Sequence, residues 1–204
     1  MIATLQIRPA SPGDASVAAK LMYATMGSLA DYLFNQDIPS IEKALAALFS
    51  RNAGRFGYQL TAIAESNGEP VGMLVACEGA KLNRANLKTF PHIFPVLGFK
   101  HAPGFIFRGV TLPGGAEAEK DEYYLCNLAV VPSAQGRGFG SQLLQHAEQT
   151  ARSHGLSKCS LIVGSHNDGA HRLYERTGYR VVESVPDHNE VPGYYRMVKT
   201  LQTL

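Results

Sequence analysis

The stretch that decides the fold runs from Tyr123 to Leu144 and reads YYLCNLAVVPSAQGRGFGSQLL. Its first half is an apolar, partly β-branched run, which predicts a buried strand that ends where Pro132 removes a backbone donor. Small residues and glycines follow, and from about Arg137 the apolar residues take helical spacing. A strand, a glycine-rich turn and the start of a helix are therefore predicted in direct succession.

The turn between this strand and this helix is suited to bind a phosphate or a pyrophosphate. Glycine-rich turns leave backbone N–H groups unblocked, and the first turn of a helix adds the positive end of its dipole. The loop lacks both the Gly-Lys-Ser/Thr ending of the phosphate loop and the third glycine of the dinucleotide fingerprint. These two nucleotide-binding motifs are therefore excluded, and the anion need not be a nucleoside triphosphate.

Two motifs resemble those of the GNAT superfamily of N-acetyltransferases. The first is Gln135-x-x-Gly138-x-Gly140 after a strand that ends LAVVP at 128–132, and it resembles the coenzyme-A loop of that family. The second is NDGAHRLYERTGY at 167–179, where the family's next helix carries Asn near its start and ends Leu-Tyr-Glu-x-x-Gly-Tyr/Phe. A turn that uses its glycines only for geometry is the alternative for the first motif, but it does not account for both in this order.

The resemblance implies an α/β fold with a mixed, mostly antiparallel central sheet, helices on both faces and a splayed central strand pair. We expect one domain over residues 1–204. Apolar periodicity and turn residues predict the elements themselves. The predicted strands are 3–8, 59–65, 70–77, 123–131, 158–164, 179–185 and 194–201, and the predicted helices are 12–34 with a break at Gly27, 40–54, 137–154 and the helix of the second motif.

Residues 79–120 are an insertion relative to the family pattern, and the resemblance says nothing about them. Because this segment contains four prolines, we expect only a short helix at 83–90, followed by an apolar turn at 91–97. Its many aromatic and aliphatic side chains must be covered. We therefore expect the insertion to fold over the acceptor end of the cleft or into a subunit contact, which would make a homodimer.

The resemblance implies acetyl-CoA as co-substrate and assigns the residues that would bind it. Leu128 would present its backbone amide to the thioester carbonyl, and Val130, next to Ala129, would contact the pantetheine arm through its main chain. Asn167 is either a pantetheine partner or a helix cap. The pyrophosphate would be held by the loop amides of Gln135, Gly136, Arg137, Gly138, Gly140 and Ser141. Gly138 and Gly140 are expected to be glycines because a Cβ would block the close approach of phosphate.

The catalytic assignments are Tyr174 and Glu122. Tyr174 resembles the residue with which many relatives protonate the departing thiolate, and the alternative is a core tyrosine. Relatives with a Glu or His base on the motif strand carry it where Tyr124 or Cys126 stands, so the usual base is missing. Strand alternation places Glu122 on the same face as these two positions, and it is our first choice for a base acting through water.

The amine acceptor would be selected by the first two helices and by the insertion. In the family, the segment that joins the first two helices lies over the acceptor pocket. The candidates there are Met26, Asp31, Tyr32 and Phe34. The alternative is that Met26 and Phe34 belong to the core and Asp31 is a solvated cap.

The composition argues against several other kinds of function. A net charge of +2 gives no argument for a nucleic-acid partner. Three widely spaced cysteines predict a reduced, cytoplasmic protein, and neither they nor the pair His166 and His171 have the partners of a metal site. No apolar run is long enough to span a bilayer, so no membrane partner is expected.

These observations predict an N-acetyltransferase that moves an acetyl group from acetyl-CoA to a primary amine of a small molecule or a protein. The amine would attack directly in a ternary complex, without a metal. The alternative, supported by the missing strand carboxylate, is a non-catalytic module that senses acyl-CoA.

Overall fold

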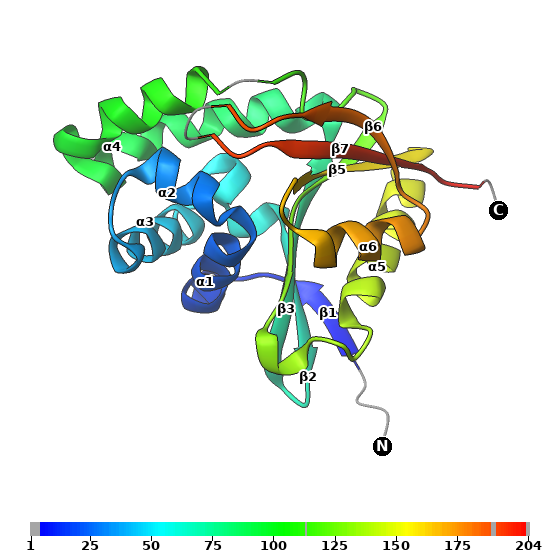
Figure 1. Ribbon diagram of the computed structural model, residues 1–204. Helices are drawn as coiled ribbons and strands as arrows, with labels where there is room; N and C mark the ends of the chain where they lie inside the picture. The colour runs from blue at the N-terminus through cyan, green and yellow to red at the C-terminus, as the bar shows by residue number, and fades with distance from the viewer. Residues whose placement is uncertain (1–4, 113, 189–190, 203–204) are drawn as a thin grey trace.

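The computed structural model describes residues 5–112, 114–188 and 191–202. A seven-stranded sheet crosses these residues in the order β1-β2-β3-β4-β5-β7-β6 (Figure 1). Only β4 and β5 pair in parallel; every other neighbouring pair is antiparallel. The strands are β1 (Leu5–Pro9), β2 (Thr61–Ser66), β3 (Glu69–Glu78), β4 (Glu122–Val130), β5 (Lys158–Gly164), β6 (Arg180–Val185) and β7 (Tyr194–Thr200).

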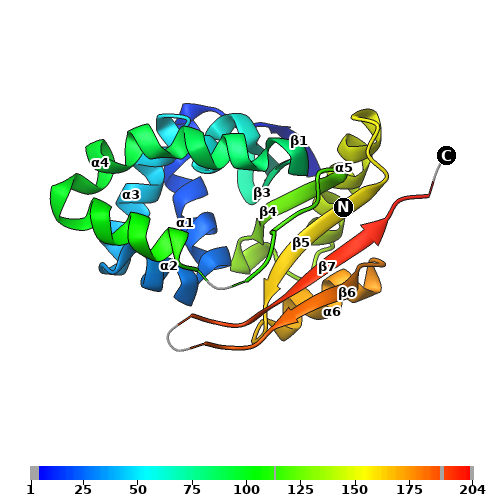
Figure 2. The same cartoon turned by 90° about the horizontal axis from the view of Figure 1, so that it is seen from above.

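Helices cover both faces of the sheet, as Figures 1 and 2 show. One face carries α1 (Ala15–Met26), α2 (Ser28–Phe34), α3 (Ile38–Ser50) and α4 (Gly79–Val110), and the other carries α5 (Phe139–Ser153) and α6 (Asp168–Arg176). The predicted mixed, mostly antiparallel α/β fold is therefore confirmed. Positions 3 and 4 of the first predicted strand, and Pro113 in the predicted insertion, lie outside the described residues.

Each face of the sheet has its own apolar core. The side of α1 to α4 buries Phe34, Leu48 and Met73, which are fully enclosed. The side of α5 and α6 buries Leu143, Ala147 and Leu161. Because successive side chains of a strand point to opposite faces, the central strands supply apolar residues to both cores at once.

The predicted splay of the central strand pair is present. The parallel register of β4 and β5 begins at Glu122 opposite Lys158 and ends at Leu125 opposite Leu161. Beyond these residues both strands continue, but no longer as partners. The register of β4 against β3 also shifts here, so that Cys126 is an extra residue in β4. Such a bulge bends the strand, and it accounts for the separation from β5.

The prediction for the insertion was wrong in its secondary structure. Residues 79–110 form the helical hairpin α4, whose two halves meet at a kink where Gly98 has a φ of 67°. Its three prolines occupy exposed positions, so the carbonyl groups that they leave without a helical partner can bond to water. Prolines that would end a buried helix are tolerated on this solvent-facing side.

The hairpin packs against α2, α3 and the short turn Gly54–Phe56. Its buried residues, among them Ile93 and Phe105, complete the core beneath it, and the Phe105 and Phe34 ring centroids lie 4.8 Å apart. Among the described residues, none of the helices combines the length and the apolar character that crossing a membrane requires.

Candidate active site

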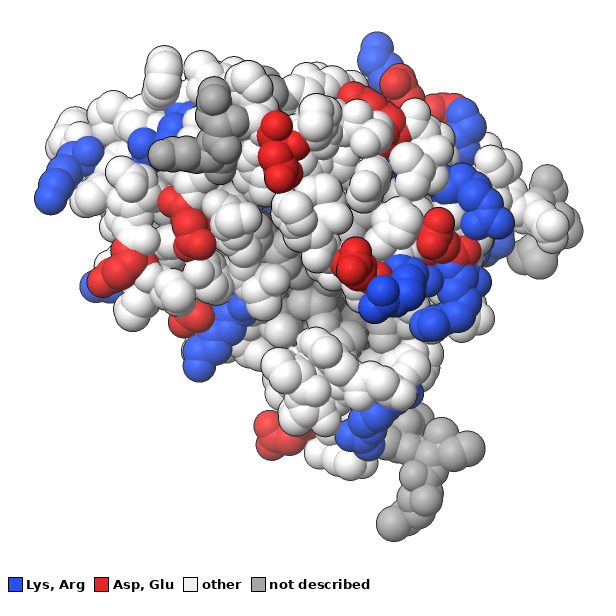
Figure 3. All heavy atoms as spheres, in the orientation of Figure 1, with Lys and Arg blue, Asp and Glu red and all other residues white. Residues whose placement is uncertain are grey.

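The separated ends of β4 and β5 open a cleft of about 570 Å³, a size typical of small-molecule sites. Figure 3 shows this cleft as a hollow near the middle of the molecule, bordered mainly by uncharged side chains, with Lys and Arg gathered over α6 beside it. Its walls come from α1, both strands, the glycine loop and α6. The predicted residues that line it are Leu128, Ala129, Val130, Gln135, Gly136, Gly138, Gly140, Ser141, Asn167 and Tyr174.

The register of β4 decides which of its peptide groups face the cleft. The Val131 N–H donates to the Val71 carbonyl at 2.9 Å. In an antiparallel ladder the peptide groups of alternate residues point to the partner strand and away from it. Leu128 and Val130 therefore point their peptide groups away from β3 and into the gap toward β5, whereas those of Ala129 face β3. Leu128 and Val130 thus have main-chain groups that face the gap, whereas Ala129 lacks a free main-chain group.

The glycine loop contains two residues with positive φ that face open space. Gly136 and Gly138 have φ values of 74° and 82°, which favour glycine, and a Cβ at either position would meet no protein atom within 4 Å. Gly138 is the residue from which α5 starts, so the first free N–H groups of this 15-residue helix face the same space.

Gly140 lines the cleft and also packs closely against the next helix. It lies inside the first turn of α5, and a Cβ there would lie 3.2 Å from Leu173 Cδ2. Close packing of α5 against α6 is therefore one reason for a glycine at this position, and the predicted approach of a phosphate stays a prediction.

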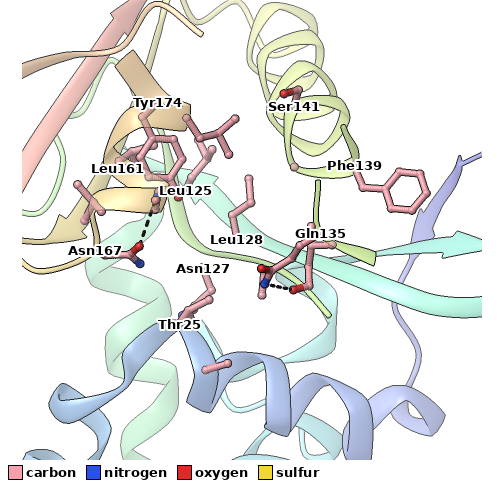
Figure 4. Close-up of a pocket in the computed structure, with 18 of the residues that line it drawn as sticks. Thr25, Leu125, Asn127, Leu128, Gln135, Phe139, Ser141, Leu161, Asn167 and Tyr174 are labelled. Atoms are coloured by element: carbon pink, nitrogen blue, oxygen red, sulfur yellow. Dashed lines mark hydrogen bonds between the residues drawn. The ribbon is translucent and has the colours of Figure 1, made fainter. Parts of the chain in front are cut away.

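The remaining loop side chains divide into two groups. Gln135 donates from Nε2 to the Val130 carbonyl at 3.0 Å, which fixes the loop to the end of β4 (Figure 4). The guanidinium of Arg137, in contrast, lies over the Phe139 ring, 5.2 Å from its centroid, and does not line the cleft. The predicted pyrophosphate contact of Arg137 therefore rests on its backbone amide alone.

Tyr174 and Asn167 project from α6 into the same cleft (Figure 4). Of the two alternatives predicted for Asn167, the structure shows the helix cap, because its Oδ1 accepts from the Ala170 N–H at 3.1 Å. The residue also lines the cleft. Burial raises the pKa of Tyr174 to about 12. Tyr174 therefore keeps its proton throughout the neutral range, and no described residue forms a hydrogen bond with its hydroxyl.

Glu122 lies outside the cleft, at the closed end of the β4–β5 pair. Its side chain is buried and accepts from Arg196 of β7 at 2.7 Å and from the Glu119 N–H at 2.9 Å. The carboxylate is therefore engaged by a buried guanidinium and does not face the space where an amine would bind. This position speaks against the predicted role of Glu122 as the base, because a base must reach the proton that it removes, directly or through one water.

Tyr124, one of the two positions at which relatives carry their base, belongs to a closed hydrogen-bond network. The Tyr124 hydroxyl donates to Glu117 Oε2 at 2.8 Å, and Arg55 donates to both carboxylate oxygens of Glu117 at 2.9 Å. Burial, and then the charge of Glu117, hold the pKa of Tyr124 well above its ordinary value. Neither Tyr124 nor Glu117 lines the cleft.

Several cleft residues were missed by sequence reasoning. Asn127 lines the cleft beside the bulge and donates from Nδ2 to Thr25 Oγ1 of α1 at 2.6 Å, while the Thr25 hydroxyl donates to the Met22 carbonyl. Arg176 lines it from the end of α6. The spacing of Gly169, Leu173 and Arg176 along one side of the second motif could have indicated Arg176, but the contact of Asn127 with Thr25, 102 residues apart, carries no local signal.

Of the residues predicted to select the acceptor, two lie in the core and two line a second pocket. Phe34 is fully buried and Met26 packs against the same core, in agreement with the alternative interpretation. Asp31 and Tyr32 line a second pocket of about 360 Å³ together with Arg108 of α4. Arg108 donates to the Leu33 carbonyl at 3.0 Å, so the hairpin contributes to this pocket but not to the main cleft.

The fold, the splayed strands and the loop together define the class of protein. A family model described as the acetyltransferase (GNAT) family matches residues 28–179, well over half of the chain. The chain therefore belongs to the GNAT family of acetyltransferases.

Two individual proteins match this chain in sequence, each over only part of its length. The uncharacterized N-acetyltransferase YycN of Bacillus subtilis (strain 168) is 35% identical over 69 residues, 34% of this chain and 44% of YycN. The chloroplastic GCN5-related N-acetyltransferase 6 of Arabidopsis thaliana is 29% identical over 91 residues, 39% of this chain and 32% of that protein. The match thus spans less than half the length of either relative.

Among solved structures, an N-acetyltransferase from Staphylococcus aureus Mu50 has a TM-score of 0.67 at 23% identity, over 95% of this chain and 99% of that one. At this level of identity the likeness concerns the fold.

Proposed function

We propose that this chain transfers an acetyl group from acetyl-CoA to a primary amine, of a small molecule or a protein, by direct attack in a ternary complex. The observation that carries the proposal is that one cleft brings together a glycine loop at a helix start, free main-chain groups of β4 and the protonated hydroxyl of Tyr174. Each of these three parts supplies one requirement of acetyl transfer.

The glycine loop and the start of α5 would bind the pyrophosphate of coenzyme A. Backbone N–H groups around Gly136 and Gly138 supply the donors, and the dipole of α5 favours the negative charge. Arg176 adds a cation to the cleft wall. The pantetheine arm would then lie between the separated strands, where Leu128 and Val130 offer main-chain partners.

Asn127 is placed to orient the acceptor. Its amide N–H group is used by Thr25, which leaves Oδ1 as an acceptor at the cleft wall on the α1 side. A primary amine that donates to this oxygen would keep its lone pair free. We therefore assign to Asn127 the positioning of the attacking nitrogen opposite the thioester carbonyl.

The reaction then needs an oxyanion donor and two proton transfers. The amine nitrogen bonds to the thioester carbonyl carbon, and the Leu128 N–H stabilises the oxyanion that forms. When the carbon–sulfur bond breaks, the leaving thiolate takes the proton of the Tyr174 hydroxyl, which solvent later restores. The proton released by the amine passes to water, since the described residues that line the cleft include no carboxylate and no histidine.

Cys126 lines the cleft but does not suit an acyl-enzyme mechanism. Hydrogen bonding to the Cys77 sulfur and burial hold the pKa of the Cys126 thiol well above its ordinary value. A thiol becomes a strong nucleophile only as the thiolate. This favours direct attack by the amine over transfer through an acetylated cysteine.

The test is coenzyme-A release from acetyl-CoA with a panel of primary amines, for the wild type and for Tyr174→Phe. The substitution should lower kcat by on the order of tenfold or more, with a smaller change in the KM for acetyl-CoA. Tyr179→Phe is the matched control, because this buried tyrosine lies beside Tyr174, with ring centroids 6.0 Å apart, yet does not line the cleft.

Two outcomes would contradict the proposal. Wild-type turnover in Tyr174→Phe would show that the Tyr174 hydroxyl does not protonate the leaving thiolate. Tight coenzyme-A binding without turnover on any amine or partner protein would favour the acyl-CoA sensor instead.

A further inference from the structure

The hairpin α4 differs from the rest of the chain in charge. Its 32 residues include Lys81, Arg84, Lys88, Lys100 and Arg108 but no Asp or Glu. The whole chain has 19 Lys and Arg, so removing these five leaves 14 against 17 Asp and Glu elsewhere. A near-neutral protein thus carries one wholly basic element.

The same hairpin carries most of the exposed apolar surface. Among the described residues, nine large hydrophobic side chains are exposed, and six of them lie on α4: Leu87, Phe90, Phe94, Phe99, Phe107 and Val110. Phe99 is 86% exposed and Phe107 is 66% exposed. Monomeric soluble proteins seldom leave such clusters uncovered, so this surface calls for a partner.

The exposed apolar residues form one stripe on each half of α4, and the two stripes meet at the kink. Leu87, Phe90 and Phe94 follow helical spacing along the first half of α4, and Phe99, Phe107 and Val110 follow it along the second. The Phe94 and Phe99 ring centroids lie 5.4 Å apart and join the two stripes at the kink. Figure 2 shows the two halves of α4 as a V at one side of the molecule.

Three of the cations on α4 are free to meet a partner. Lys81 pairs with Glu78 at 2.6 Å, and Arg108 donates to the Leu33 carbonyl. The side chains of Arg84, Lys88 and Lys100 are exposed and form no hydrogen bond or ion pair with the described residues.

We infer that α4 binds the surface of an anionic lipid membrane, with its exposed phenylalanines in the interface and its Lys and Arg side chains at the headgroups. Basic residues beside an apolar helical face are the pattern of interfacial helices, which lie on a bilayer without crossing it. A second copy of this chain fits less well, because a two-fold contact through α4 would bring two wholly basic surfaces together. The inference replaces the expectations of a subunit contact and of no membrane partner.

Binding through α4 is compatible with an accessible cleft. None of the α4 residues lines the cleft, and the hairpin lies on the opposite face of the sheet from α5 and α6 (Figures 1 and 2). The inference does not depend on the proposed acetyl transfer, so its test reads binding to lipid and not turnover.

The absence of tryptophan from the chain allows a direct test. Phe99→Trp places a single fluorophore on the exposed apolar surface, and its emission should shift to the blue with vesicles of phosphatidylcholine and phosphatidylserine, but not of phosphatidylcholine alone. High salt should reverse the shift, since it screens the charges. Gln149→Trp, at an exposed position on α5, is the matched control and should not respond.

A second pair of variants tests whether binding depends on the cations of α4 or only on the net charge of the protein. Arg84→Gln/Lys88→Gln/Lys100→Gln should weaken co-sedimentation with the anionic vesicles by about a hundredfold, as ~1 kcal/mol per cation implies. Lys20→Gln/Lys43→Gln/Lys120→Gln removes the same charge from exposed positions outside α4 and should have little effect. Thermal unfolding of each variant confirms that it is folded.

Three results would overturn the inference. The first is no binding to either kind of vesicle, and the second is an equal loss of binding in the two triple variants. The third is a wild-type dimer that Phe99→Ser dissociates, because this would assign the surface to self-association.

Discussion

Along their first residues β4 and β5 lie paired, and the buried Glu122–Arg196 ion pair closes this end, whereas from Cys126 onward the same strands separate and line the cleft. At the paired end the two strands pair with each other through their main chains, and the Glu122 carboxylate pairs with Arg196. At the open end, the peptide groups of Leu128 and the hydroxyl of Tyr174 have none among the described residues. Under the proposed function, the paired end stabilises the fold and the open end carries out the reaction, and the bulge at Cys126 marks the boundary between them.

The largest effect is expected from breaking the closed end. Glu122→Ala leaves the guanidinium of Arg196 buried without its carboxylate, and should lower the free energy of unfolding by about 3–5 kcal/mol, measured by urea denaturation. The neighbouring Asp121→Ala removes an exposed partner of Lys158 and should change the stability little.

The same variant separates the two roles considered for Glu122. If this residue stabilises the closed end, kcat per folded molecule should remain close to the wild-type value. A well-folded Glu122→Ala with kcat reduced a hundredfold would instead make Glu122 the general base.

An intermediate effect is expected at the open end, where two glycines of the loop can be compared. Gly138→Ala places a Cβ at a φ of 82°, which costs roughly 1–2 kcal/mol, and should weaken coenzyme-A binding by about tenfold in calorimetry. Gly140→Ala only brings a Cβ to 3.2 Å from the Leu173 side chain, which can move, so its affinity should stay near that of the wild type. Equal affinities in both variants would argue against the loop as the anion site.

The smallest effect on turnover is expected at the bulge, where Cys126 lies between the paired and the open ends. Cys126→Ala removes a thiol that lines the cleft but is held protonated, so steady-state turnover should be nearly unchanged. Loss of turnover together with an acetylated Cys126 in the wild type, detected by mass spectrometry, would show that the acetyl group passes through the enzyme.

Sequence reasoning succeeded where the relevant residues are neighbours in the chain. The strand, the glycine turn and the helix start of residues 123–144 depend on local periodicity and on positive φ at Gly136 and Gly138, and these properties are visible in the sequence. The same holds for Asn167, whose capping partner is three residues away.

It failed where distant residues decide the outcome. The role of Glu122 is set by Arg196, which lies 74 positions later, and that of Asn127 by Thr25. The register of β4 against β3 turns the peptide groups of Ala129 away from the cleft, and a single strand does not reveal this. From the sequence, the α4 prolines predict a broken segment. The prediction failed because the sequence does not show that all three prolines would face solvent.

The most direct test of the central claim is the change in backbone amide chemical shifts when acetyl-CoA is added to the wild-type protein. The account predicts large changes at Leu128, Gly136 and Gly138, and small ones at Glu122 and Tyr123, because only the open end has main-chain groups free to bind. Changes concentrated at the closed end, or in α4, with none in the glycine loop would contradict the assignment of the splayed strands as the acetyl-transfer site.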